Sequence, residues 1–308
     1  MPKAYVFTRY GGPEAEALVE VDRPVPGPGQ VLVAVRAAGV NPVDWKQRTG
    51  YRRPGESGSH DFPAVFGNEV SGVVEELGDE VRDLAVGDEV FGRPVEGGYS
   101  EYALLSVDLI ARKPAALSFA DAATLPVAAA TALDGIAQLG LPSGATVLVT
   151  GAGGGVGVAV VQIARARGLR VVGLASEGKK DFVESLGAVH VPAGPGWTER
   201  VRAAAPEGVD GVYDLVGADV LTEAATLPAD PAKVVTAGAP AEDVEKLGGA
   251  RVTRFRTSDR LEAVADIVVK GELDPHVTRT FPLDRAGEAL RAVEEGHARG
   301  KIVIEVAR

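Results

Sequence analysis

The sequence predicts an α/β protein in which a doubly wound parallel sheet is accompanied by a second, β-rich part. The first observation is the stretch 146–168, which has the pattern of a buried strand, a glycine-rich turn and a helix. The second is the alternation of short apolar runs with helical patterns that continues to residue 237. The third is the β-rich pattern of residues 1–110 and of the last run, 301–306.

Composition limits the classes of protein that fit. The 308 residues suffice for one large or two ordinary domains, and 45% of them are hydrophobic. The net charge of −11 argues against a nucleic-acid partner, and the lack of cysteine excludes disulfides, thiol catalysis and zinc sites with thiolate ligands. The first 20 residues have no apolar signal-peptide core, and no apolar run is long enough for a bilayer. We therefore expect a soluble, cytoplasmic protein.

The first part of the chain has short β-branched runs separated by proline and glycine clusters. The strands predicted from these runs cover 4–8, 30–38, 69–77 and 89–92. A long irregular stretch, 41–63, interrupts them and contains Trp45, Tyr51 and Phe62. Long loops on a β scaffold are usually functional, so we interpret it as a binding loop.

A helix is predicted to begin near residue 120. Ser118 is a candidate N-cap, and Asp121 places a negative charge in the first turn. The pattern continues as an apolar helix over 126–139, which Gly140 ends.

The glycine turn after strand 146–150 is the predicted dinucleotide site. Its pattern Ala152-x-Gly154-x-x-Gly157 fits G-x-G-x-x-G with alanine in first place. Such a turn lets the backbone approach a pyrophosphate, and the following helix offers free N–H groups and a positive dipole end. The residues predicted to bind the cofactor here are Ala152, Gly154, Gly155, Val156 and Gly157. The alternative is a glycine-rich loop without a ligand.

The rest of the chain continues the alternation. Predicted strands cover 170–175, 189–191, 211–216, 233–237 and 250–256, and predicted helices cover 156–167, 179–186, 197–205, 219–227, 260–270 and 284–295. The final strand, 301–306, is expected to rejoin the first domain.

Several motifs in the same order resemble one known family. They are NPVDWKQRTGY (41–51), FGNEVSGVV (66–74), VGDEVFG (86–92), GGYSEYALL (97–105), LPVAAATAL (125–133), VLVTGAGGGVG (147–157), VYDLVG (212–217) and GHARGKIVIEV (296–306). The chain resembles the zinc-independent medium-chain dehydrogenase/reductases of the quinone oxidoreductase-like type. The resemblance implies a GroES-like catalytic domain from residues 1–115 and 261–308, and a Rossmann dinucleotide-binding domain over 116–260.

The same comparison implies that no metal is bound. Zinc-dependent relatives have cysteine and histidine ligands where this chain has Asn41 and Asn68. Amides are poor zinc ligands, and no thiolate compensates. The four histidines, at 60, 190, 276 and 297, are too far apart in sequence to suggest a ligand pair.

The end of the second Rossmann strand indicates the nucleotide. An NAD site usually has an acidic residue there, whereas this chain has Ser176 followed by Lys179 and Lys180. These side chains can bind a 2′-phosphate, so we predict NADPH, with Lys180 slightly ahead of Lys179 on register. One alternative is that Glu177 binds the ribose. Another is that both lysines lie on a solvated first turn.

The resemblance also implies roles for residues around the reacting ring. Asn41 and Thr131 would border the nicotinamide, and the backbone near Gly238 would receive its carboxamide. Phe255 and Lys301 match positions that line the cofactor. Lys46 and Tyr51 are the candidate catalytic residues, a hydrogen-bond donor to the substrate carbonyl and an orienting group or proton donor. The alternatives are an exposed loop lysine and a packing tyrosine.

The function expected from these observations is NADPH-dependent reduction of quinones or α,β-unsaturated carbonyl compounds by direct hydride transfer. A homodimer is implied by the resemblance, through the sheet edge near 250–255. The alternative is a nucleotide-binding redox sensor or structural protein with little turnover. A zinc alcohol dehydrogenase is a third and weaker candidate.

Overall fold

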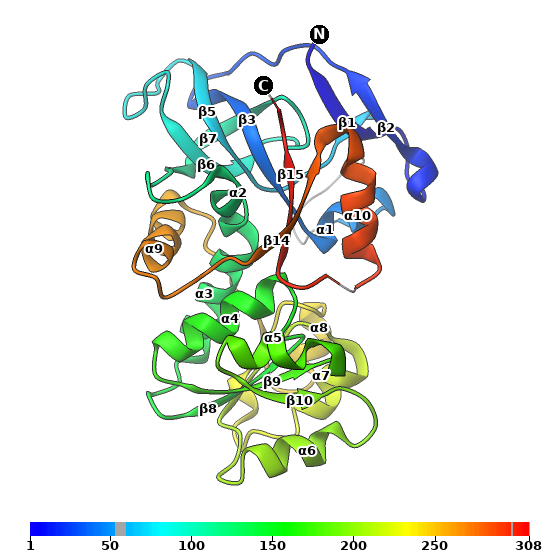
Figure 1. The fold of residues 1–308 in the computed structure, drawn as a ribbon, viewed down its shortest axis with the longest axis vertical. Coiled ribbons are helices and arrows are strands. Elements are labelled where there is room, and N and C mark those ends of the chain that lie inside the picture. The colour runs from blue at the N-terminus through cyan, green and yellow to red at the C-terminus, as the bar shows by residue number, and fades with distance from the viewer. Residues whose placement is uncertain (53–59, 297, 308) are drawn as a thin grey trace. The chain divides into compact units, whose positions relative to one another are not determined.

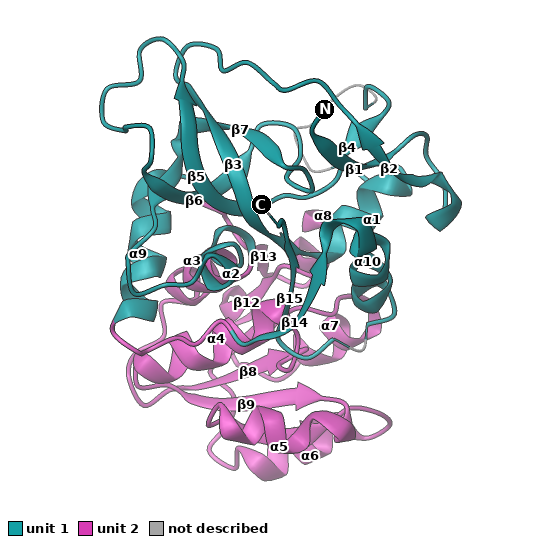
Figure 2. Ribbon diagram, turned by 45° about the horizontal axis from the view of Figure 1, so that its top comes forward, with its two compact units in different colours: residues 1–127, 256–269, 276–308 teal, residues 128–255, 270–275 magenta. Residues whose placement is uncertain are grey.

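The computed structural model describes residues 1–52, 60–296 and 298–307. The chain forms two compact units, which Figure 2 shows in different colours. Unit 1 consists of Met1–Val127, Arg256–Val269 and His276–Arg308. Unit 2 consists of Ala128–Phe255 and Lys270–Pro275. The expected architecture of a GroES-like β domain and a Rossmann-like α/β domain is confirmed.

Unit 1 is built on a sheet whose described strands have the order β14-β15-β3-β5-β6-β7. An additional pairing between β3 and β7 closes four of these strands into a ring, which leaves them no free edge. The strands are β3 (Gln30–Val40), β5 (Val70–Leu77), β6 (Glu89–Pro94), β7 (Tyr102–Arg112), β14 (Val277–Pro282) and β15 (Lys301–Glu305). A smaller sheet contains β1 (Lys3–Phe7), β2 (Glu16–Glu20) and β4 (Ala64–Val65).

The last strand confirms the expectation that the chain's end rejoins the first domain. β15 pairs antiparallel with β3, with Ile302 opposite Val40 and Ile304 opposite Ala38. On its other side β15 runs parallel to β14, and the two strands lie side by side in Figure 1. The last strand of the chain and strands from the first 112 residues therefore form one sheet.

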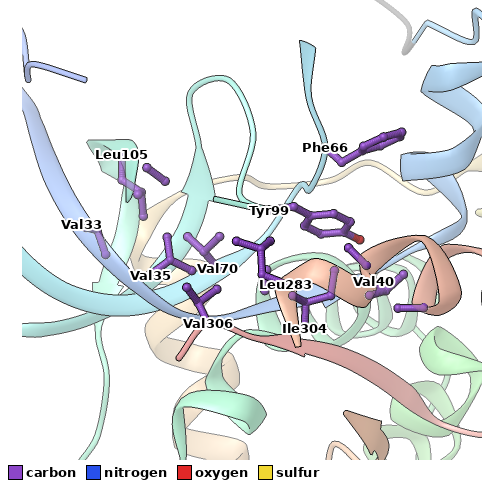
Figure 3. Packing of buried hydrophobic residues seen from close by; sticks show 14 of the residues in the cluster. Val33, Val35, Val40, Phe66, Val70, Tyr99, Leu105, Leu283, Ile304 and Val306 are labelled. Atoms are coloured by element: carbon purple, nitrogen blue, oxygen red, sulfur yellow. The ribbon is translucent and has the colours of Figure 1, made fainter. Parts of the chain in front are cut away.

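The core of unit 1 lies between this sheet and the helix α10 (Ala286–Glu294). Figure 3 shows its apolar side chains, among them Val35, Val70, Leu283 and Ile304, gathered around Tyr99. Each fully buried side chain of this size stabilises the fold by about 1.5–3 kcal/mol. Tyr99 is completely buried, and its hydroxyl reaches a polar group described below.

A helix was missed in the stretch interpreted as irregular. Residues Pro42–Arg48 form α1, which begins with a capping box between Asn41 and Asp44 and has proline in its first turn. Its last residue, Arg48, is buried and pairs with Glu16 and with Glu294 of α10. The prediction of a loop was wrong here because aromatic and charged residues obscured the start signal in Asn41–Asp44. The remainder of that loop, 53–59, lies outside the described residues.

Unit 2 contains a parallel sheet with the order β10-β9-β8-β11-β12-β13 in the described residues. The strand order reverses between β8 and β11, which is the switch point where such sheets bind ligands. Its strands are β8 (Thr146–Thr150), β9 (Arg170–Ala175), β10 (Val189–Pro192), β11 (Gly211–Asp214), β12 (Val234–Thr236) and β13 (Ala250–Arg251). Its helices are α3 (Ala130–Leu139), α4 (Gly155–Ala166), α5 (Lys180–Ser185), α6 (Trp197–Ala204), α7 (Ala218–Ala224) and α8 (Ala241–Glu245).

The boundaries between the two units differ from the predicted domain boundaries, 115/116 and 260/261. The chain passes from unit 1 to unit 2 after Val127 and returns to unit 1 after Phe255. The short helix α2 (Phe119–Ala122) belongs to unit 1, where Ser71 donates a hydrogen bond of 2.5 Å to the Phe119 carbonyl. The helix α9 (Ser258–Val269) also belongs to unit 1, and Ser258 bonds the Val107 carbonyl. The strand predicted over 250–256 was too long, because pairing in β13 ends at Arg251.

By length and composition, the helical stretch Phe119–Leu139 could cross a membrane. However, 83% of its most apolar window is buried inside the structure, as in a core helix. Its apolar character is therefore explained by packing.

Candidate functional site

The glycine turn of unit 2 has the geometry of a phosphate cradle. Gly151, directly after β8, has φ +68°, a conformation that favours glycine. A Cβ on Gly157 would lie 2.3 Å from the Gly151 carbonyl oxygen, so only glycine permits this close turn. Gly154 is the N-cap of α4, and no side chain of the described residues caps that end. The first N–H groups of a 12-residue helix are thus left for a ligand.

The other predicted residues of this turn lie either at the start of α4 or in the buried part of the turn. Gly155 and Val156 begin α4, and both are half-buried. Ala152 is completely buried, and its N–H donates to the Leu174 carbonyl of β9 at 3.2 Å. Ala152 therefore ties the turn to the neighbouring strand. An alanine at the first motif position fits because its side chain packs inward.

The end of β9 brings a lysine onto the glycine turn. A Cβ on Gly153 would lie 2.8 Å from Cδ of Lys179, so the aliphatic part of this lysine passes over the turn. Ser176 is exposed at the end of β9, and its carbonyl accepts the Lys179 N–H at 2.9 Å. Lys180 is exposed and begins α5. Lys179 therefore lies against the turn, and Ser176 is joined to it through the backbone. The predicted contacts of Ser176, Lys179 and Lys180 with a 2′-phosphate stay predictions.

Three more predicted residues lie in unit 2. Thr131, in α3, is buried, and its carbonyl accepts the Tyr213 hydroxyl at 2.7 Å. Gly238 follows β12, and its N–H donates to the Thr236 hydroxyl at 3.0 Å. Phe255 has 54% of its side chain exposed, and its N–H donates to Asp134 at 2.9 Å. The predicted contacts of these residues with a nicotinamide stay predictions.

In unit 1, Asn41 and Lys301 lie in one buried polar network. The Lys301 ammonium is 2.8 Å from Oδ1 of Asn41 and 2.9 Å from Oε1 of Glu69. Asn41 in turn donates to the same Glu69 oxygen at 2.8 Å. The second Glu69 oxygen accepts the Val127 N–H at 2.7 Å. Lys301 and Glu69 are 3% and 0% exposed, so this is a fully buried ion pair. The predicted contact of Lys301 with the cofactor stays a prediction, but its ammonium already serves Glu69 and Asn41.

A second carboxyl group, Asp44, continues this network. It accepts the Asn41 N–H and the Tyr99 hydroxyl, each at 2.8 Å, and also the Asn68 amide. Asn68 further donates to Gln47 at 3.0 Å. Burial raises the pKa of Asp44 to about 6, against the lowering effect of these hydrogen bonds. Asp44 fixes the N-cap of α1 and thereby the backbone of Asn41.

The candidate catalytic residues lie at the end of α1. Lys46 is half-buried, with its ammonium 5.6 Å from the centre of the Trp45 ring. The Lys46 carbonyl accepts the Tyr51 N–H at 2.9 Å, which brings the two residues together. Tyr51 has 36% of its side chain exposed. Their roles toward a substrate stay predictions.

The polar network of unit 1 does not fit a zinc ion. The two positions that hold ligands in zinc-dependent relatives carry Asn41 and Asn68, whose amides bond Glu69, Asp44 and Gln47. A cation is already present there, because the Lys301 ammonium touches Asn41 and Glu69. In the described residues, no group of three or more His, Cys, Asp or Glu side chains has the arrangement of a metal site.

Sequence reasoning missed Glu69 and Asp44 as members of this network. Glu69 stands at the start of a predicted strand, next to the apolar run that ends at Val74. A charge in such a place must find partners, and this was the available signal. The start signal Asn41–Asp44 would have identified Asp44 as a capping residue.

The chain is similar to known proteins over nearly its whole length. Residues 186–304 match the family described as "Zinc-binding dehydrogenase", and residues 27–115 match "Alcohol dehydrogenase GroES-like domain". The chain is 33% identical to a 2-methylene-furan-3-one reductase of Solanum lycopersicum, over 98% of this chain and 78% of the relative. It is also 33% identical to an NADPH-dependent alkenal/one oxidoreductase of Arabidopsis thaliana, over 98% and 79%. The solved quinone oxidoreductase of Coxiella burnetii superposes with a TM-score of 0.90 at 30% identity, over 99% of both chains.

Replacing Lys301 by methionine should destabilise the protein by about 3–5 kcal/mol, because the Glu69 carboxylate then stays buried without its cation. Urea unfolding measures the loss. The double variant K301M/E69Q should recover part of it, since no charge is left. Arg285→Met, which breaks an exposed pair with Glu288 in the same unit, is the control and should change little. A K301M protein as stable as the control would contradict the ion pair.

Replacing Asp44 by asparagine should remove a pH-dependent part of the stability. Between about 4 and about 6 the folded chain holds a proton that the unfolded chain releases, so the contribution of Asp44 falls as pH rises. The difference in unfolding free energy between wild type and D44N should therefore drop by about 3 kcal/mol over this window and stay constant above it.

The control for this titration is Asp88→Asn. The Ala85 N–H and Arg112 lower the pKa of Asp88, so its contribution changes only below the ordinary range of an aspartate. The difference between wild type and D88N should be flat between pH 4 and pH 6. An equally flat difference for D44N would show that Asp44 is not a group of raised pKa.

Proposed function

This chain belongs to the quinone oxidoreductase-like family of the medium-chain dehydrogenases/reductases, and we propose that it reduces quinones or α,β-unsaturated carbonyl compounds with NADPH and without zinc. It is an NAD(P)H-dependent oxidoreductase, as its relatives and their names indicate. The proposal concerns the finer points: the coenzyme, the substrate and the absence of a metal. The homodimer and the cytoplasmic location predicted from the sequence remain part of it.

The observation that carries the proposal is the glycine turn of unit 2. Its uncapped α4 start and the close approach of Gly157 to Gly151 suit a pyrophosphate. The turn follows β8, next to the reversal of strand order. Gly155, Val156 and Gly157 would hold the pyrophosphate with backbone N–H groups, whereas the Gly154 N–H donates to the Gly151 carbonyl at 3.0 Å and shapes the turn.

The choice of NADPH over NADH rests on Ser176 and Lys179. The position that usually carries an acid is occupied by Ser176, whose hydroxyl can bind a phosphate oxygen. The stem of Lys179 lies on Gly153, which points to this lysine rather than Lys180 as the main phosphate partner. A relative named as NADPH-dependent supports the same choice.

The chemistry needs a hydride source and stabilisation of negative charge on the acceptor. Bound NADPH would supply the hydride. Lys46 would donate a hydrogen bond to the substrate carbonyl as it becomes enolate-like, and Tyr51 would orient the substrate or deliver the proton. One hydride and one proton convert a quinone to a hydroquinone, or an enone to a saturated ketone. Relatives named for quinone and alkenal reduction support both acceptor classes.

The second candidate function is a nucleotide-binding redox sensor with little turnover. The observation in its favour is that the Lys301 ammonium, a predicted cofactor-lining group, already bonds Glu69 and Asn41. Binding without reduction would distinguish it from the proposed reductase.

Purified protein incubated with NADPH and a panel of quinones and enones should consume the reduced coenzyme, followed by loss of its nicotinamide absorbance. Addition of a chelator should leave the rate unchanged, because no side-chain group among the described residues has the arrangement of a metal site. Coenzyme binding without oxidation by any acceptor would instead support the sensor. Loss of activity on chelation would contradict the metal-free proposal.

Lys179→Met should lower kcat/KM with NADPH by about tenfold and change that with NADH little, because only NADPH has the 2′-phosphate. Lys180→Met is the matched control and should have a smaller effect. Steady-state kinetics with both coenzymes give the two ratios. A larger loss in K180M would assign the phosphate to Lys180, and no loss in either variant would contradict the site.

A further inference from the structure

A buried carboxylate joins the ends of three neighbouring strands in unit 2. Asp214 is the last residue of β11, which lies between β8 and β12. Its Oδ1 accepts the hydroxyl of Thr150, the last residue of β8, at 2.6 Å. Its Oδ2 accepts the hydroxyl of Thr236, the last residue of β12, also at 2.6 Å. All three side chains are completely buried.

The same groups also hold the chain where it leaves the strands. The Asp214 carboxylate accepts the Val216 N–H at 3.2 Å and the Gly217 N–H at 3.0 Å. The Thr150 hydroxyl accepts the Leu215 N–H at 3.0 Å. The Thr150 hydroxyl therefore donates to the carboxylate and also accepts from the backbone.

The Thr236 hydroxyl acts in the same way on the segment after β12. It accepts the N–H groups of Gly238 and Ala239 at 3.0 and 3.1 Å. A Cβ on Gly238 would lie 2.6 Å from the Leu215 carbonyl carbon and 2.7 Å from the Val216 nitrogen. Gly238 is thus pressed against the segment that Asp214 holds, and neither can shift without the other.

The segments fixed in this way are those expected to bind the coenzyme. Thr150 directly precedes Gly151 and the glycine turn. Thr236 precedes Gly238, the predicted partner of the carboxamide. The neighbouring Tyr213 donates to the Thr131 carbonyl at 2.7 Å and so ties α3 to the same strand. A carboxylate with several strong acceptor sites can join such segments, whereas an apolar residue cannot.

We infer that Asp214 is a positioning residue for coenzyme binding, acting through Thr150 and Thr236 on the turn at Gly151 and on the segment at Gly238. The inference rests on the proposed function, because it presupposes that unit 2 binds NADPH. Thr236 would act on the segment at Gly238, which is predicted to bind the nicotinamide end of the coenzyme. Asp214 and both threonines touch backbone and one another, so they act on the ligand only through those segments.

The test uses the full chain and the variant Thr236→Val, which keeps the shape of the side chain and removes its hydroxyl. T236V should raise the Kd for NADPH about tenfold, since Gly238 loses its partner. The Kd for adenosine 2′,5′-bisphosphate, which has no nicotinamide, should stay within about twofold. Thr236→Ser keeps the hydroxyl and should restore NADPH binding. Coenzyme fluorescence and calorimetry give the constants.

Asp210→Asn is the matched control at the other end of the sheet. There the Asp210 carboxylate accepts the Thr146 N–H at 2.7 Å, so a carboxylate again holds a strand of this sheet. D210N should leave both binding constants unchanged, while Asp214→Asn should weaken NADPH more than T236V does. Urea unfolding of each variant shows how much stability is lost.

The outcomes separate this inference from the proposed function. Wild-type protein that binds neither NADPH nor the bisphosphate would overturn both. A different result would overturn the positioning role alone. In that case the wild type binds NADPH, and the dissociation constants of T236V and D214N equal those of D210N, even if T236V and D214N are less stable. Equal weakening of NADPH and the bisphosphate by T236V would also overturn it, because that is a general loss of structure.

Discussion

Each unit of this protein buries charged side chains, and the requirement that a buried charge be paired or hydrogen-bonded determines the local geometry. In unit 2 the charge is Asp214, which is satisfied by hydroxyl and backbone groups from three strands. In unit 1 the buried charges include Lys301 and Glu69, which meet at 2.9 Å and are both hydrogen-bonded to Asn41. In both cases the buried group holds a segment to which the family resemblance assigns a role at the coenzyme. In each unit, the bonds that satisfy the buried charge therefore also fix residues of the predicted coenzyme site.

The network of unit 1 satisfies its buried polar groups with side chains and backbone groups of the chain itself. Where zinc-dependent relatives have ligands, this chain has amides that bond carboxyl groups of its own. The ammonium of Lys301 supplies the positive charge that Glu69 requires. Asp44 holds the Asn41 backbone and receives the Tyr99 hydroxyl from the core. Asn41 is thus fixed on both its backbone and its side chain.

Much of the fold could be predicted from the sequence, because local patterns determined it. The glycine turn at 151–157, the alternation that follows it and the return of the last strand to the first domain all have period or composition signals. The helix α1 was missed although its capping signal was present, and the strand at 250–256 was predicted too long. Register placed Lys180 slightly ahead of Lys179, and only the fold shows that the stem of Lys179 lies on Gly153.

The polar networks could not be predicted in the same way. Lys301 and Glu69 are 232 positions apart, and Thr150 and Asp214 are 64 apart, so no local pattern connects them. The sequence indicates only that a charge stands in an apolar run. Which partner satisfies it depends on the order of the strands, and that order is a property of the whole fold.

We propose that unit 2 binds a reduced dinucleotide on its glycine turn, with the 2′-phosphate beside Ser176 and Lys179. Calorimetric titration of the purified protein with NADPH and with NADH measures this binding. NADPH should bind saturably at one site per chain, with a lower Kd than NADH. No binding of either coenzyme at saturating concentrations would contradict it.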